Sequence, residues 1–546
     1  MSSSLASTAV EMGDLSNLDP QVSNSNHSPM TTPSATNTTR DREPKPKPES
    51  EASPGAEEEV DPEYPSGIKL ISIFIGLLLS ILCVGLDRSI IATAVPKITT
   101  EFNSLDDVGW YGSSYLLTAC CFQLMMGKMY AEFSVKWLFL GTLGIFEIGS
   151  IVCAAAPNST ALIIGRAIAG LGTAGLATGA LLEEFLPIKS HGDGASGSTF
   201  LLEVKEKKTR STTWRQLLDK LDILGTIFLL PATICLLLAL QWGGSTYAWS
   251  SWRCILLLCI AGVCGVIWGI VQVHEGERAT VPLRLIKMRS IVGAMWLVFM
   301  IFAALFIATY YISIWFQAVK NDSAYQAGIN FLTATVAMSL TSVLAGFLTS
   351  AIGYYVPQML AGSAITAVAS GLIVRFDLNT STGYWMGSLI LLGLGIGTCG
   401  QQSMMVPQTI LTGADISLGT SLMIFAQTIS GTIFLSVCQN VFQEKLLHEL
   451  ESRVPAADPA VVIAHGASGL KSAMGDIYPK DVVDGILRAY SDAMQNIWII
   501  SVVLACLSIL GVMLVEWKSV KKDKKSSNGS LEEDGSARAN APADVV

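Results

Sequence analysis

Apolar residues occur in long runs that recur along this chain from about residue 68 to residue 516. A helix needs about 20 mostly apolar residues to cross the hydrocarbon core of a bilayer. Gly and Pro interrupt several of the runs, which membrane helices tolerate better than soluble helices do. Twelve runs meet the length requirement: 68–95, 108–131, 135–156, 161–182, 222–242, 252–273, 291–318, 325–352, 355–375, 384–407, 416–441 and 494–516. The pattern predicts an all-α polytopic membrane protein with twelve transmembrane helices.

The composition agrees with this prediction. Of the 546 residues, 51% are hydrophobic and 14% charged, whereas soluble domains are about 25% charged. The net charge of −9 is unevenly placed, because residues 1–66 carry twelve acids and four bases and the rest is nearly neutral. These values exclude a soluble multidomain enzyme and a nucleic-acid binder with a basic domain. We therefore expect no enzyme activity and no nucleic-acid partner.

The chain opens with a polar segment rather than a secretory signal peptide. Residues 1–66 are rich in Ser, Thr, Pro, Asn and Glu, a composition that cannot bury enough apolar surface to fold, so we expect disorder. All eleven cysteines fall in or beside apolar runs and show no metal-ligand spacing. The sequence therefore predicts no disulfide framework, no metal site and no cofactor.

Lys and Arg in the short connections predict the orientation, because cytoplasmic loops carry an excess of both. With the N-terminus inside, the cytoplasmic connections hold eighteen bases and the short outside loops four. Both termini are thus expected in the cytoplasm, with a longer outside loop over 443–492 that forms short amphipathic helices. The predicted parts are a disordered acidic tail (1–66), a first bundle (67–182), a cytoplasmic loop (183–220), two linker spans (221–275), a six-span bundle (290–517) and a disordered tail (518–546).

The absence of two sequence motifs argues against two classes of membrane protein. It contains no GxxxxGK[ST] phosphate-binding loop, which argues against an ATP-driven pump. It has no TVGYG-like filter, which argues against a selective ion channel. Many glycines and few charges within the spans are typical of a secondary transporter.

Four stretches resemble a known family. Residues 86–96 read LDRSIIATAVP and residues 165–172 read GRAIAGLG; later, 310–319 read YYISIWFQAV and 419–427 read GTSLMIFAQ. Together they are similar to 14-span drug:proton antiporters of the major facilitator superfamily, and especially to fungal multidrug and toxin efflux members. The resemblance covers roughly residues 68–182 and 212–517. It implies two helical bundles that alternate access to a central site.

The chain departs from that family in two places. Residues 127–134 read GKMYAEFS where the family has GxLaDRxGR, so Ala131 stands at the aspartate position and Glu132 and Lys136 are candidates to replace it. The GPxxGG signature of the fifth span is absent, and no Gly-Pro dipeptide occurs in the chain. The resemblance implies that the fifth and sixth spans are missing and that the first bundle is incomplete with four helices. An altered gene product and an imperfect gene model both explain this.

Three charged residues within the spans are candidates for proton coupling, since a charge at the centre of a bilayer is costly and usually functional or paired. Glu147 lies in the middle of the third span, where burial favours a group that binds and releases a proton. Arg166 cannot deprotonate, and the resemblance implies that it modulates proton release or substrate entry. Asp87 lies near the outer third of the first span, beside Arg88, and the resemblance implies a structural or coupling role for it. Structural alternatives are a carboxyl bonded to a neighbouring helix for Glu147, an ion pair from Arg166 to Glu147 or Asp87, and a solvated Asp87–Arg88 pair.

Polar and aromatic residues in the second half are candidates for the substrate site, because drug-sized ligands bind in apolar cavities with a few polar groups. These residues are Tyr310, Tyr311, Trp315, Gln317, Gln401 and Gln427. Aromatic residues near helix ends also serve as interface anchors, which is the alternative for Trp315.

The leading prediction is a proton-coupled exporter of hydrophobic organic molecules such as a drug, toxin or secondary metabolite. Its expected partners are that substrate, protons and the lipid bilayer. We expect a monomer in the plasma membrane, with the vacuolar membrane as the alternative location. Two other functions stay open: a non-transporting or poorly folded truncated protein, and an uptake permease for a small nutrient or metal chelate.

Overall fold

The computed structural model describes residues 75–87 except 77 and 81, then 98, 102, 108–190, 222–244, 247–459, 461–462 and 470–519, without the side chains of 108–109, 183–190 and 472–473. All belong to one compact unit, Pro62–Val546. The acidic tail 1–66, most of the loop 183–220 and the tail beyond Ser519 lie outside the described residues. Their predicted disorder and their cytoplasmic placement stay predictions.

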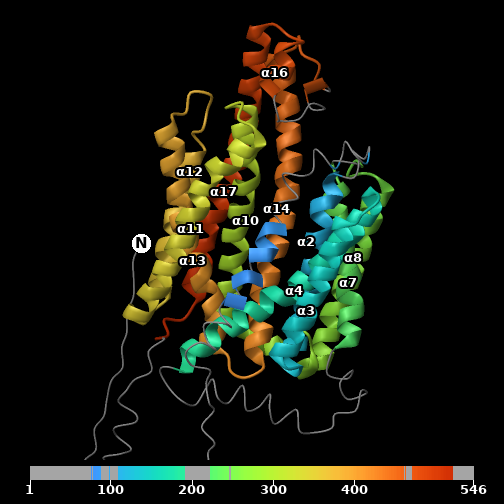
Figure 1. The fold of residues 1–546 in the computed structure, drawn as a ribbon, viewed down its shortest axis with the longest axis vertical. Coiled ribbons are helices and arrows are strands. Elements are labelled where there is room, and N and C mark those ends of the chain that lie inside the picture. Colours follow the sequence, from blue (N-terminus) through green and yellow to red (C-terminus); the bar gives the residue numbers. More distant parts are fainter. Residues whose placement is uncertain are drawn as a thin grey trace, which may run out of the picture. The chain divides into compact units, whose positions relative to one another are not determined.

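Five long helices of the first half are described: α2 (Val108–Glu132), α3 (Val135–Ala154), α4 (Ser159–Ser190), α7 (Ile223–Trp242) and α8 (Trp252–Glu275). Helix α4 packs against both α2 and α3, which barely touch each other, and α7 pairs with α8. Helix α2 also packs on α14 of the second half (Figure 1).

The second half begins after two short helices, η2 (Gly276–Arg278) and α9 (Leu283–Lys287). Its long helices are α10 (Arg289–Ala318), α11 (Ala324–Ile352), α12 (Val356–Ile373), α13 (Thr382–Ile410), α14 (Asp415–Arg453) and α17 (Lys480–Leu514). Helix α10 packs against α14 and α17, and α13 packs against α11 and α12 (Figure 1).

The predicted fold class is confirmed. Ten of the described helices are long and apolar enough to cross a membrane, and each overlaps one predicted span. The second predicted span is α2, a helix of 25 residues. The first is described in part, as helix over Leu78–Asp87. No named strand occurs among the described residues, which hold only isolated bridges such as Gly243 to Tyr247.

The prediction of short amphipathic helices over 443–492 is wrong at both ends of that segment, which belong to two long helices. Helix α14 continues to Arg453 over 39 residues, and α17 begins at Lys480 and spans 35 residues. At 1.5 Å per residue these helices are about 58 and 52 Å long, well beyond a hydrocarbon core of about 30 Å. Arg453 pairs with Asp492 of α17 at 2.6 Å, so the two extensions support each other. The remaining helix in the described part is α16 (Leu470–Gly475).

Small residues at four-residue spacing, Gly175/Gly179 and Gly393/Gly397, allow the helices to approach closely. A Cβ added at Gly175 would lie 2.7 Å from Thr142 Cβ of α3, and one at Gly179 would lie 2.7 Å from Phe139 Cδ2. At Gly393 it would lie 2.9 Å from Met338 N of α11, and at Gly397 3.1 Å from Met338 C. These glycines therefore permit the close packing of α4 on α3 and of α13 on α11.

The α7–α8 pair is fastened at the end where α7 begins. Asp222 caps α7, and its buried carboxylate accepts hydrogen bonds from Gly225 N, Gln272 Nε2 of α8 and both N and Oγ1 of Thr280, all at 2.7–2.8 Å. The Lys128 ammonium of α2 donates to the Ala279 carbonyl at 3.1 Å. The segment that follows α8 is therefore tied to α7, α8 and α2.

The opposite end of α7 bridges α2 and α14. Gln241 Nε2 donates to Ser113 Oγ of α2 at 2.7 Å, and Ser436 of α14 donates to the Leu240 carbonyl. Trp249 Nε1 donates to Asn440 Oδ1 of α14 at 3.2 Å. Helix α7 is thus bonded to one helix from each half of the chain.

Candidate functional site

Helix α4 carries Arg166 into the space between its neighbours because glycines surround it in the sequence. A Cβ at Gly165 would lie 2.7 Å from Cys153 Sγ of α3, and one at Gly170 would lie 3.0 Å from the Tyr115 carbonyl carbon of α2. The three backbones are therefore close, and the long Arg166 side chain is only 3% exposed. A buried guanidinium requires partners, since burying an unpaired charge is costly.

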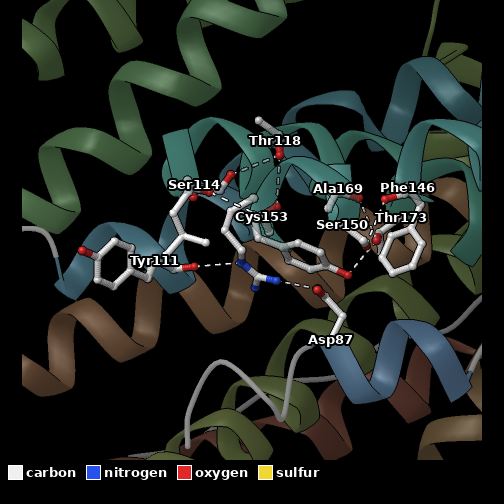
Figure 2. A network of polar contacts seen from close by, with 12 residues as sticks. Asp87, Tyr111, Ser114, Thr118, Phe146, Ser150, Cys153, Ala169 and Thr173 are labelled. Carbon is white, nitrogen blue, oxygen red and sulfur yellow. Dashed lines mark hydrogen bonds and ion pairs between the residues drawn. The ribbon is translucent and has the colours of Figure 1, made fainter. Parts of the chain in front are cut away.

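Two oxygens and one aromatic ring hold the Arg166 guanidinium. Nε donates to the Tyr111 carbonyl of α2 at 2.9 Å, and Nη1 donates to Asp87 Oδ2 at 2.5 Å (Figure 2). Cζ lies 4.4 Å from the centroid of the Tyr115 ring, in cation–π geometry. The structure thus brings Asp87 and Arg166, two of the three predicted proton-coupling residues, into one ion pair.

A second set of contacts fixes the Tyr115 ring. Its hydroxyl and Thr173 Oγ1 are 2.6 Å apart, and Thr173 Oγ1 donates to the Ala169 carbonyl at 3.0 Å (Figure 2). Arg166 and Thr173 are seven residues apart on α4 and therefore share a face of the helix. Tyr115 spans both, with its ring on the guanidinium and its hydroxyl on Thr173.

The chemistry of this pair depends on which member can change its charge. Arg166 stays protonated at any physiological pH, so only Asp87 can gain or lose a proton. The side chain of Asp87 is 18% exposed against 3% for Arg166, which leaves the carboxylate the more accessible partner. Protonation of Asp87 would replace a charge-assisted contact by a weaker neutral one. The arrangement can therefore couple a proton to the position of Arg166.

Glu147, the third predicted residue, lies elsewhere. It is on the exposed face of α3, beside Ile148 and Ile151, which are 56% and 65% exposed, whereas α3 meets α4 through Gly149 on its other face. Within the described part of the chain, no hydrogen bond or ion pair reaches its carboxylate. The expected burial of Glu147 among protein groups is wrong, and Asp87 rather than Glu147 is the partner of Arg166.

The segment 127–134, which departs from the family motif and is mostly the last part of α2, packs tightly against the second half. A Cβ at Gly127 would meet the Ser421 side chain of α14 and lie 3.2 Å from the Ser417 carbonyl. Ala131, at the motif's aspartate position, is buried in the core, and the buried charge here is Lys128. Glu132 is half-buried and Lys136 is exposed, lying over the Trp137 ring.

Two of the predicted substrate residues are packed into the interior. Trp315 is fully buried on α10, with its ring 4.8 Å from that of Phe376, and the Lys320 ammonium lies 5.3 Å from its centroid. Burial lowers the pKa of Lys320, which lies between α10 and α11. Tyr311 is 1% exposed and contacts the ring of Trp498. Neither side chain is at a surface where a ligand could touch it without repacking, and Trp315 is not an exposed interface anchor.

The other four predicted substrate residues are at least partly accessible. Tyr310 is 50% exposed, and Gln317, Gln401 and Gln427 are half-buried. Phe302 and Phe306 of α10 lie against Gly400 of α13 and Gly431 of α14, at 3.4 Å and 2.8 Å from the added Cβ positions. Gln427 precedes Gly431 by four residues and therefore shares its face of α14. Gln401 directly follows Gly400 on α13. No group of metal-ligating side chains occurs in the described ranges.

Two residues of these contacts were not predicted from the sequence. Tyr115 lies in an apolar run, where a tyrosine gives no signal of its own. Lys128 lies one turn inside the predicted end of the second span, and an ammonium at that position is a sequence signal that a partner is needed.

Comparisons with known proteins show which proteins this chain is similar to. The family model described as Major Facilitator Superfamily matches residues 77–193. The chain is 41% identical to the MFS-type efflux pump MFS1 of Arthroderma benhamiae, over 86% of this chain and 95% of that protein. It is 37% identical to the efflux pump aflT of Aspergillus parasiticus, over 84% and 98%. A solved bacterial homologue of the human lysosomal transporter Spinster is 15% identical with a TM-score of 0.47, over 83% of this chain and 100% of that one.

The identity to these relatives extends over nearly their whole length, and the described helices match the predicted spans. The chain belongs to the major facilitator superfamily and is a multi-pass membrane protein.

Proposed function

We propose that this protein is a proton-coupled secondary transporter that exports hydrophobic organic molecules by alternating access. The observation that carries the proposal is the buried ion pair between Asp87 and Arg166. The relatives named as efflux pumps support export rather than uptake.

The proposed cycle uses Asp87 as the proton-binding group. A proton that enters from outside neutralises the carboxylate, and Arg166 loses its charged partner while it stays cationic. Removing one charge from a buried pair costs about 3–5 kcal/mol, which is enough to favour a second arrangement of α4 and the first span. Release of the proton to the cytoplasm re-forms the pair and resets the cycle.

The substrate site in this proposal is the partly exposed face of α10 with Gln401 and Gln427. Tyr310 and Gln317 belong to it, whereas Tyr311 and Trp315 support it from inside the helix packing. Phe302 and Phe306 supply apolar contact, and the glutamines supply a few hydrogen bonds, which suits a hydrophobic molecule with a few polar groups.

The experiment is dye efflux from cells that overproduce the full chain. Cells loaded with rhodamine 6G should lose the dye faster than cells without the protein, and a protonophore should abolish the difference. Efflux that is unaffected by the protonophore would overturn proton coupling, and no added efflux with any of a panel of lipophilic dyes would overturn export.

A second candidate function, a truncated protein without transport activity, has one observation in its favour. The alignment with the Arthroderma protein runs over 516 positions but covers 86% of this chain, about 470 residues. About 46 positions then have no counterpart here, which is enough for two spans of about 20 residues. The same dye experiment separates the two functions.

A further inference from the structure

We propose that Tyr115 is a positioning residue for Arg166, and that its hydrogen bond to Thr173 sets the pH at which the Asp87–Arg166 pair opens. The inference rests on the proposed proton-coupling role of that pair. The contact between Tyr115 of α2 and Thr173 of α4 would thus control the charge state of Asp87, although Tyr115 and Thr173 are themselves uncharged.

The geometry fixes Arg166 from three directions. Asp87 holds Nη1, the Tyr111 carbonyl holds Nε, and the Tyr115 ring covers the guanidinium at 4.4 Å from its centroid. A ring is a weak restraint when it can tilt, because cation–π attraction depends on the cation lying over the face. The Tyr115 ring can therefore restrain Arg166 only if the orientation of the ring is itself fixed.

Thr173 provides that anchoring. Its hydroxyl is buried at 2% exposure, lies 2.6 Å from the Tyr115 hydroxyl and donates to the Ala169 carbonyl one turn earlier on α4. The Tyr115 hydroxyl therefore donates to Thr173, since the single Thr173 proton is already used. The ring is held at its hydroxyl end by the same helix that carries Arg166.

Other described groups also surround the pair. From α3, the Cys153 thiol lies near enough to interact with both Asp87 and Arg166. From α2, the Tyr111 hydroxyl donates to Ser159 Oγ at 2.9 Å. Among the described residues, the charged partner of Asp87 is Arg166.

The expected effect follows from the balance between paired and protonated Asp87. A looser guanidinium stabilises the carboxylate less, so a lower proton concentration suffices to neutralise it. Tyr115→Phe and Thr173→Val each remove the hydroxyl contact, and Tyr115→Leu removes the ring as well. Each should move the midpoint of the pH profile of efflux to higher pH, by about half a unit or more for Tyr115→Leu.

The chain offers a matched control on the same two helices. Gln123 Nε2 of α2 donates to Thr178 Oγ1 of α4 at 2.6 Å, and Thr178 Oγ1 donates to the Ala174 carbonyl. Thr178 is fully buried. Thr178→Val therefore makes the same change in the same kind of contact, away from Arg166, and should leave the midpoint where it is.

The test measures rhodamine 6G efflux by the full chain as a function of external pH for wild type and the four variants. The inference predicts a shift for Thr173→Val and Tyr115→Phe and none for Thr178→Val. Equal midpoints for Thr173→Val and Thr178→Val would overturn it. If wild-type efflux does not depend on pH, or persists in Asp87→Asn, the proposed proton coupling has failed instead.

A second measurement decides the inference without transport. Thermal unfolding of the purified full chain is recorded for Thr173→Val and Thr178→Val, each alone and combined with Asp87→Asn. A positioning role predicts that the Tm loss of Thr173→Val becomes smaller when Asp87 no longer pairs with Arg166, while that of Thr178→Val is additive. Additive losses for both would contradict the proposal.

Discussion

At the scale of single residues, the charged side chains within the spans differ in whether they are buried and paired. Arg166 is buried and held by Asp87, Tyr111 and Tyr115, whereas Glu147 faces away from α4. The two carboxylates are equally conspicuous in the sequence, and only their surroundings separate them. We therefore propose Asp87, rather than Glu147, as the proton-binding group.

Arg166→Lys tests whether geometry matters as well as charge. One ammonium cannot reproduce both the Nε contact to Tyr111 and the Nη1 contact to Asp87, nor the planar stack on Tyr115. We expect efflux to fall at least about tenfold, since a lost charge-assisted bond is worth about 1.5–3 kcal/mol. The initial rate of dye efflux, normalised to the amount of protein in the membrane, measures it. Full activity of the lysine variant would show that only the positive charge is needed.

Glu147→Gln separates the two candidate proton-binding carboxylates. Removing an unpaired charge from a lipid-facing position should raise Tm, because acidic side chains at the helix centre cost about 2.5–3.5 kcal/mol on insertion scales. Efflux and its protonophore sensitivity should persist, in contrast to Asp87→Asn. Loss of coupling in Glu147→Gln with retention in Asp87→Asn would return the role to Glu147.

At the scale of helices, close contact between α3 and α4 depends on small residues. A Cβ at Gly149 would lie 2.7 Å from Ala169 Cα, whereas Gly144 on the same helix has nothing within 4 Å of that position. Gly149→Val should therefore destabilise the fold by about 1–3 kcal/mol through overpacking. Gly144→Val is the matched control, and Tm of the purified protein compares the two. Equal Tm values would mean that α3 and α4 are not in contact as described.

The α7–α8 pair depends on one buried carboxylate. Asp222→Ala leaves Gln272 Nε2 and both donors of Thr280 without their acceptor, at about 1–3 kcal/mol for each buried group. Ser323, which caps α11 at an exposed site, is the control, because Ser323→Ala removes a single bond to Gln326 N. We expect a lower Tm for Asp222→Ala than for Ser323→Ala. The reverse order would contradict the hydrogen bonds described for Asp222 at the start of α7.

The helices were predictable from the sequence because a bilayer imposes a length and a polarity on every span. The extensions of α14 and α17 beyond the membrane were not, since the apolar run ends where the lipid ends while the helix continues to Arg453 and begins at Lys480. The pairing of Asp87 with Arg166 was one of two alternatives. The orientation of Glu147 could not be predicted, because α3 is apolar on all sides and its sequence marks no inner face.

At the scale of the whole molecule, the alignments with the two relatives contain more positions than this chain has residues to fill. The absent GPxxGG signature indicates that the missing length falls after α4, before the two linker helices α7 and α8. The described helices of the two halves meet, since α2 packs against α14 and α7 is bonded to both.

Sequencing the transcript between codons 180 and 215 tests the origin of the difference. If a segment is missing from the gene model, the transcript should contain about 50–60 additional codons, the length of two spans with their loops. The longer chain should then show greater efflux and a higher Tm than the chain described above. A transcript that matches the present sequence would show that the protein itself lacks the pair.

The central claim is that a proton bound at Asp87 drives export. Proteoliposomes that contain the purified full chain, loaded with a pH-sensitive dye, measure it directly when rhodamine 6G is added. We expect a proton flux opposite to the dye flux in wild type and no proton flux in Asp87→Asn. Dye transport without proton movement, or an unchanged proton flux in Asp87→Asn, would contradict it.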